Sequence, residues 1–125
     1  MTVLIDSWAW IEYFRGSETG RKAGRIIEDE EEAVVSTINI AEVYRWVLRF
    51  YDEDKAKEKV SAMKQRCFVI NVTEEIAIKS AKIKHETKLG LGDAIILATA
   101  NQGNARVLTG DPDFKGMEDV VYLGD

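Results

Sequence analysis

Short apolar runs alternate with longer amphipathic segments along the chain, a pattern typical of strands that alternate with helices. The apolar runs predict five strands, at residues 2–5, 33–36, 67–72, 106–109 and 120–123. Between them, apolar residues recur at helical spacing and predict helices over residues 7–15, 18–30, 38–51, 52–65, 73–88 and 93–102. Strands that alternate with helices form right-handed βαβ units, so we expect an α/β fold with a mostly parallel sheet and helices on both faces.

The length and composition describe an ordinary globular protein. The chain has 125 residues, of which 46% are hydrophobic and 31% charged, so we expect one domain over residues 1–125. The formal net charge of −5 argues against a broad basic surface that grips nucleic acid. It does not exclude an enzyme that acts on nucleic acid, because bound divalent cations reverse the local charge of an acidic site.

Features of the sequence favour a cytoplasmic location. No apolar run approaches the roughly 20 residues that span a bilayer, and the start, MTVLIDSW, lacks the basic residues of a signal peptide. Cys67 is the only cysteine, so no intramolecular disulfide can form, which fits a reducing compartment. The acidic run EDEEE at 28–32 is interpreted as a solvated helix end.

Five carboxylates lie next to the predicted carboxyl ends of strands or at helix starts. Asp6 ends the first strand, and Glu42 is expected in the first turn of the helix after the second strand. Asp93 opens the apolar helix before the fourth strand, while Asp111 and Asp113 follow that strand. Ligands of open parallel sheets bind outside the carboxyl ends of the strands, so these acids are candidates for one shared site.

Each acid could instead serve only as a helix cap. Asn39 and Glu42 have the spacing of a capping box, and Asp111 precedes Pro112 as a cap precedes the first helical residue. Caps need not converge, however, whereas one edge of the sheet would bring these acids together.

Converging carboxylates point to divalent cations. Several carboxylates within a few ångströms cannot all stay ionised without protons or cations. Oxygen ligands without cysteine or histidine favour Mg²⁺ or Mn²⁺ over zinc. Such ions can activate water and stabilise a leaving oxygen, so the residues alone suggest metal-assisted phosphodiester hydrolysis.

Four segments resemble the PIN-domain family, most closely the VapC-type toxin ribonucleases of toxin–antitoxin pairs. They are VLIDSWAWIEYFRG (3–16), NIAEVY (39–44), LGLGDAIILATA (89–100) and LTGDPDF (108–114). Their order and spacing fit the family over essentially the whole chain. The resemblance implies a Rossmann-like fold with strand order 3-2-1-4-5 and Mg²⁺- or Mn²⁺-dependent RNA cleavage. It also implies a cognate antitoxin protein and a homodimer.

The resemblance assigns roles to particular residues. The acids that bind metal and act in catalysis would be Asp6, Glu42, Asp93 and Asp111. Asp113 would be an accessory metal ligand, Thr109 would hold Asp111 by a hydrogen bond, and Ser7 would orient the site beside Asp6. Trp8 departs from the family pattern, because a small polar residue is common at that position.

Other polar residues are expected to lie outside the acidic cluster. Arg15 and Lys88 could contact RNA phosphates beside the acids, or could belong to a solvated face. His85 is expected at the surface and Cys67 in the core. Glu12, six residues after the first aspartate, is expected to face away from the site. The segment LGLG lacks both the dinucleotide fingerprint and the P-loop lysine, so we expect no nucleotide cofactor.

Aromatic residues on two helices suggest a partner surface. Trp8 and Trp10 cannot share a helix face, so at least one is expected to reach the surface, where an apolar patch marks a partner site. The resemblance suggests a homodimer contact or a groove for an antitoxin segment.

Three rival interpretations remain. A phosphoacceptor receiver domain would need an acidic pair at the first strand, an aspartate after the third and a lysine after the fifth, where this chain has Asp6 alone, Asn71 and Gly124. A haloacid-dehalogenase-like phosphatase needs a second aspartate where Trp8 stands. The serious rival is a PIN-fold binding module that docks a protein or RNA partner without cleaving.

Overall fold

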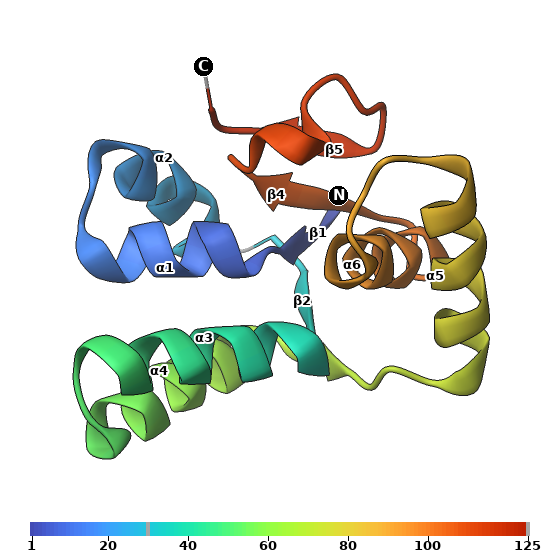
Figure 1. Cartoon of the computed structure of the whole chain (residues 1–125). Helices are drawn as coiled ribbons and strands as arrows, with labels where there is room; N and C mark the ends of the chain where they lie inside the picture. The colour runs from blue at the N-terminus through green and yellow to red at the C-terminus, as the bar shows by residue number, and fades with distance from the viewer. Residues whose placement is uncertain (30, 125) are drawn as a thin grey trace.

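A five-stranded, all-parallel sheet forms the centre of the computed structural model, which describes residues 1–29 and 31–124 (Figure 1). The strands are β1 (Thr2–Ile5), β2 (Ala33–Ser36), β3 (Phe68–Ile70), β4 (Ala105–Thr109) and β5 (Val120–Tyr122). They are ordered β3-β2-β1-β4-β5, and every neighbouring pair is parallel. The predicted α/β class and strand order 3-2-1-4-5 are confirmed.

Helices cover both faces of the sheet. They are α1 (Ser7–Arg15), α2 (Glu18–Ile27), α3 (Thr37–Phe50), α4 (Glu53–Arg66), α5 (Glu74–Glu86) and α6 (Leu91–Gln102), with a 3₁₀ turn η1 (Pro112–Phe114). The first four lie on one side of the sheet and α5 and α6 on the other (Figure 1). Within the described residues, no helix combines the length and apolar character that crossing a membrane requires.

The two faces of β1 belong to two separate cores, because side chains alternate along a strand. Val3 and Ile5 pack among α1 to α4, in the cluster that contains Trp10. Leu4 packs in the second cluster, which contains Ile96 of α6. A central strand buried on both faces explains the uninterrupted apolar run that predicted it.

Element ends differ from the predictions in a few places. The second helix stops at Ile27, and its expected end, Glu30, lies outside the described residues. Helix α6 begins at Leu91 rather than Asp93, because Gly90 is its N-cap. Cys67 does not begin a strand: it is the C-cap of α4. Its predicted place in the core is confirmed, and burial raises the pKa of its thiol to about 11.

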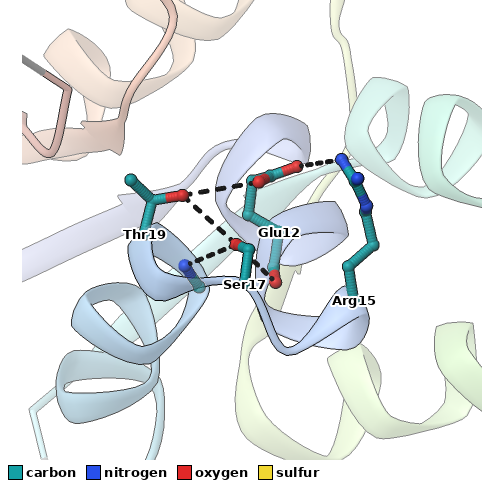
Figure 2. Close-up of polar contacts among 5 residues, drawn as sticks. Glu12, Arg15, Ser17 and Thr19 are labelled. Carbon is teal, nitrogen blue, oxygen red and sulfur yellow. Dashed lines mark hydrogen bonds and ion pairs between the residues drawn. The ribbon is translucent and has the colours of Figure 1, made fainter.

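The corner between α1 and α2 depends on close backbone contact and a polar network (Figure 2). Gly16 ends α1 in the left-handed region, with φ of 69°, where glycine is favoured. Ser17 caps α2 by accepting a hydrogen bond from the Gly20 amide. Glu12 accepts from Arg15 at 2.9 Å and from Thr19 at 3.4 Å, so it faces this corner, at the far end of α1 from Asp6.

Candidate active site

Loops and helix starts at the carboxyl edge of the sheet bring the predicted acids together. Asp93 lies in the first turn of α6, while Asp111 and Asp113 belong to the turn after β4. One carboxylate oxygen from each of these three residues lies within 4.8 Å of the other two. Asp6 and Glu42 lie close enough for their charges to act on the same group of acids.

Asp6 is held by Thr109 rather than used as a helix cap. It occupies the N-cap position of α1 but makes no side-chain cap hydrogen bond. Its Oδ2 accepts a hydrogen bond of 2.8 Å from the Thr109 hydroxyl. The Thr109 hydroxyl oxygen in turn accepts from the Asp111 amide at 3.0 Å. Thr109 thus holds Asp111 by a hydrogen bond, as expected, through the Asp111 backbone amide. Its own single proton goes to Asp6.

Ser7 orients Glu42, with help from a residue that the sequence did not single out for the site. The Ser7 hydroxyl donates to Glu42 Oε1 at 2.7 Å and accepts from Asn39 Nδ2 at 2.9 Å. Asn39 is fully buried, and its Oδ1 accepts from the Ser36 amide. Because Asn39 donates to the Ser7 oxygen, the Ser7 proton is directed to the carboxylate.

The capping box differs from the one expected. It joins Ser36 and Asn39, not Asn39 and Glu42, because α3 begins at Thr37. Glu42 therefore lies in the second turn rather than the first, and its side chain remains available to the site. The sequence contained a usable signal, since Ser36 stands three residues before Asn39 as in a capping box.

Capping and convergence are compatible at Asp111. This residue is the N-cap of η1, with Pro112 at the first position, and its Oδ1 accepts from the Asp113 amide at 3.0 Å. The proposed cap therefore exists, yet the same carboxylate lies beside Asp93. The cap interpretation fails for Asp93, because Gly90 is the N-cap of α6.

Burial and mutual repulsion raise the pKa of two of the acids. Removal from water is the main cause for Asp6, whose pKa rises from 3.8 to about 7; the Thr109 hydrogen bond opposes this rise and the charges of Glu42 and Asp93 add to it. The pKa of Asp93 rises to about 6, mainly by burial and then by the charges of Asp111, Asp113 and Glu42. The metal-free site therefore favours proton uptake.

These pKa shifts predict that the metal-free protein loses stability as the pH rises from about 4 to about 7. In this range Asp6 is protonated in the folded protein but ionised in the unfolded chain. A rise in pH therefore favours the unfolded chain and lowers the free energy of unfolding, by at most about 1.4 kcal/mol per pH unit for one group. Urea unfolding in EDTA at pH 5.5 and 7.5 measures the effect. Equal or greater stability at pH 7.5 would contradict it.

Trp8 supports the turn that carries the acids, which accounts for the departure from the family pattern. A Cβ atom placed on Gly110 would lie 2.3 Å from Trp8 Cη2. The indole therefore covers the backbone of Gly110, between Thr109 and Asp111. Trp10 is 1% exposed and belongs to the core, so of the two tryptophans only the half-buried Trp8 reaches the surface.

The two basic residues expected near the acids lie in different places. Arg15 ends α1, about 12 Å along the helix from Ser7, and pairs with Glu12, so the structure does not bring it to the acids. Lys88 is exposed in the segment before α6, five residues ahead of Asp93. His85 is exposed, as predicted.

The arrangement fits a hard divalent cation. Asp93, Asp111 and Asp113 offer three carboxylate oxygens close enough to share one ion, and repulsion from neighbouring acids adds to burial in raising the pKa values of Asp6 and Asp93. All-oxygen ligand sets of this kind suit Mg²⁺ or Mn²⁺.

Comparison with known proteins identifies the family. The PIN domain model matches residues 3–120, and no curated protein sequence matches the chain. A toxin–antitoxin complex from Klebsiella pneumoniae contains a chain 28% identical, with a TM-score of 0.81 and coverage of 98% of both chains. VapC20 of Mycobacterium tuberculosis, a sarcin–ricin loop cleaving toxin, is 16% identical, with a TM-score of 0.78 over 94% of this chain and 96% of that one. FitAcB from Neisseria gonorrhoeae is 22% identical, with a TM-score of 0.70 over 98% and 96%. On the match over residues 3–120, we conclude that the chain belongs to the PIN-domain family.

Proposed function

We propose that this protein is a divalent-metal-dependent endoribonuclease and the toxin of a VapBC-type pair, acting as one domain over residues 1–125. The observation that carries the proposal is the convergence of Asp93, Asp111 and Asp113. Asp6 and Glu42 complete the catalytic set, each held by a hydroxyl donor, Thr109 and Ser7 respectively. Clustered acids that repel one another are costly to a protein that does not use them, which disfavours the silent binding module.

Each acid would have its own role in catalysis. Bound Mg²⁺ or Mn²⁺ would supply Lewis acidity toward the phosphate and make water a stronger nucleophile. Asp93, Asp111 and Asp113 would hold the ion. Asp6 would add a buried carboxylate, fixed by Thr109. Glu42, more exposed and oriented by Ser7, would face the solvent side, where its carboxylate can accept a hydrogen bond from the attacking water.

The antitoxin proposal rests on the similar structures, whereas the homodimer and the cytoplasmic location are extended from the family resemblance. The Klebsiella pneumoniae structure is a toxin–antitoxin complex, and VapC20 of Mycobacterium tuberculosis is a toxin. We extend to this chain a cognate antitoxin and a homodimeric state, and a cytoplasmic location where RNA is available to it. Size-exclusion chromatography with light scattering tests the dimer, which should elute at twice the 14.1 kDa chain mass.

The proposal is tested by incubating purified, partner-free protein with a mixed panel of RNAs in Mg²⁺, Mn²⁺ or EDTA. We expect cleavage in either metal and none in EDTA. A protein that binds Mn²⁺ but cuts no RNA of the panel would instead favour the binding module. Cleavage that persists in EDTA would contradict metal dependence and point to contamination or to another chemistry.

Ser7→Ala is expected to weaken the site without unfolding the protein. The substitution removes the donor that orients Glu42 and leaves Asn39 Nδ2, which is buried, without its acceptor. Loss of such a supporting hydrogen bond reduces metal affinity or activity by about 10- to 100-fold. Single-turnover cleavage of the best RNA of the panel measures the effect. Ser61→Ala, at an exposed site on α4, is the control and should behave as wild type.

A further inference from the structure

One face of α3 carries cations and aromatic rings in a row that begins at the acidic site. Glu42, Arg45, Trp46, Arg49 and Phe50 follow one another at helical spacing and line one hollow together with a residue of α1. We call these five residues the α3 strip. Because Glu42 belongs to the proposed site, the strip leads directly away from it.

The hollow continues between α1 and α3, which pack against each other and run side by side away from the sheet (Figure 1). A cavity of about 440 Å³ is lined by Arg15, Trp46, Phe50 and Tyr51, a size within the range of small-ligand pockets, about 300–1,000 Å³. The centre of the Trp46 ring lies 5.0 Å from that of Phe50 and 6.2 Å from that of Tyr51. Arg15 is held at this place by its pair with Glu12 (Figure 2).

Two arginines supply the positive charge of the strip. Within the part of the chain that the structure describes, Arg45 and Arg49 have no ion-pair partner, and Arg49 lies 5.4 Å from the centre of the Phe50 ring. Farther on, Lys55 and Lys59 share a single acid, Glu58. A chain with a net charge of −5 thus gathers positive charge beside its acidic site.

We propose that single-stranded RNA leaves the acidic site along the α3 strip, with phosphates on Arg45 and Arg49 and bases stacked on Phe50 and Tyr51. The inference rests on the proposed function and names the path of its substrate. Proteins bind single strands by combining a basic groove with aromatic side chains on which bases stack. Phe50 and Tyr51 are 57% and 62% exposed, so their faces are open to stacking, and the arginines beside them favour a phosphate backbone over an apolar protein segment.

The electrostatic part of the proposal is tested with Arg45→Ala/Arg49→Ala. Binding of a fluorescent single-stranded RNA is measured by anisotropy in EDTA, which stops cleavage, over a series of salt concentrations. Each lost phosphate contact lowers the salt slope of log K by about 0.7, so the double variant should lose about 1.4. The matched control is Arg21→Ala/Arg25→Ala, which removes two exposed arginines from α2 and should leave the slope unchanged.

The stacking part is tested with Phe50→Ala/Tyr51→Ala. Stacking on one aromatic side chain contributes roughly a tenfold factor in affinity or more per base. This variant should therefore weaken binding at least about tenfold at every salt concentration while the slope stays as in wild type. A blunt-ended RNA duplex, whose bases are already stacked, should bind wild type and variant equally.

The outcomes distinguish the proposed RNA path along α3 from the proposed nuclease activity. If both double variants bind the single strand as wild type does, the path is wrong, and the strip is left to a protein partner. If the variants bind less tightly but wild type never cleaves RNA in Mg²⁺ or Mn²⁺, the path stands and the nuclease proposal falls. Cleavage by wild type together with unaltered binding by the variants would overturn the path alone.

Discussion

Asp6→Asn is expected to abolish RNA cleavage while making the metal-free protein more stable at pH 7.5. Asparagine has the shape of aspartate and can still accept the Thr109 hydrogen bond, but it carries no charge. Without this charge the site should lose several kcal/mol of transition-state stabilisation, which lowers the cleavage rate by about a thousandfold or more. The rise in pKa from 3.8 to about 7 implies a gain on the order of 4 kcal/mol in the free energy of unfolding, since one pKa unit is worth about 1.4 kcal/mol.

Two measurements check this prediction. Single-turnover cleavage in Mn²⁺ gives the rate, and urea unfolding in EDTA at pH 5.5 and 7.5 gives stability. The gain should be larger at pH 7.5, because Asp6 of the wild type is then ionised. Asp119→Asn changes an exposed aspartate and should alter neither quantity. An Asp6→Asn protein that is active, or less stable than wild type at pH 7.5, would contradict the assigned role.

Gly20→Ala is expected to destabilise the protein strongly. Its Cβ atom would lie 2.0 Å from the Glu12 carbonyl oxygen and 2.5 Å from the carbonyl carbon, so the backbones of α1 and α2 would have to separate. Overpacking typically lowers the free energy of unfolding by about 1–3 kcal/mol, and a backbone clash belongs at or above the upper end. For a chain of this length we expect the melting temperature to fall by about 10 °C or more.

A matched glycine substitution serves as the control. At Gly103 a Cβ atom would meet only ordinary contacts, the nearest at 3.8 Å, and its φ of −94° suits any residue. Gly103→Ala should change stability by less than about 1 kcal/mol. Thermal unfolding of both variants decides the matter, and equal melting temperatures would show that the α1–α2 corner adapts.

The fold was largely readable from the sequence because strands β1, β2 and β4 are mostly buried and the helices are amphipathic. The first two strands have the predicted ends. The third does not, because the mostly apolar segment CFVINV (67–72) contributes only Phe68–Ile70 to the sheet, as an edge strand. The run itself could not show that α4 would continue to Arg66.

The acids of the candidate site could be proposed from sequence, but their hydrogen-bond partners could not. The register that pairs Ile5 with Leu108 places Asp6 beside Thr109, and register is a property of the assembled sheet. Asn39 was noticed only as half of a cap. Its second hydrogen bond, to Ser7, crosses from α3 to α1 and depends on how those helices pack.

The shared cation site is tested most directly by Mn²⁺ binding, because this measurement requires no knowledge of the RNA. Free Mn²⁺ can be followed by electron paramagnetic resonance during titration of wild type, Asp93→Asn and Asp119→Asn. We predict saturable binding by wild type and Asp119→Asn, and a loss of at least about tenfold in affinity for Asp93→Asn. If wild type does not bind Mn²⁺, or if Asp93→Asn binds it equally well, these acids do not form a metal site and the nuclease proposal fails with them.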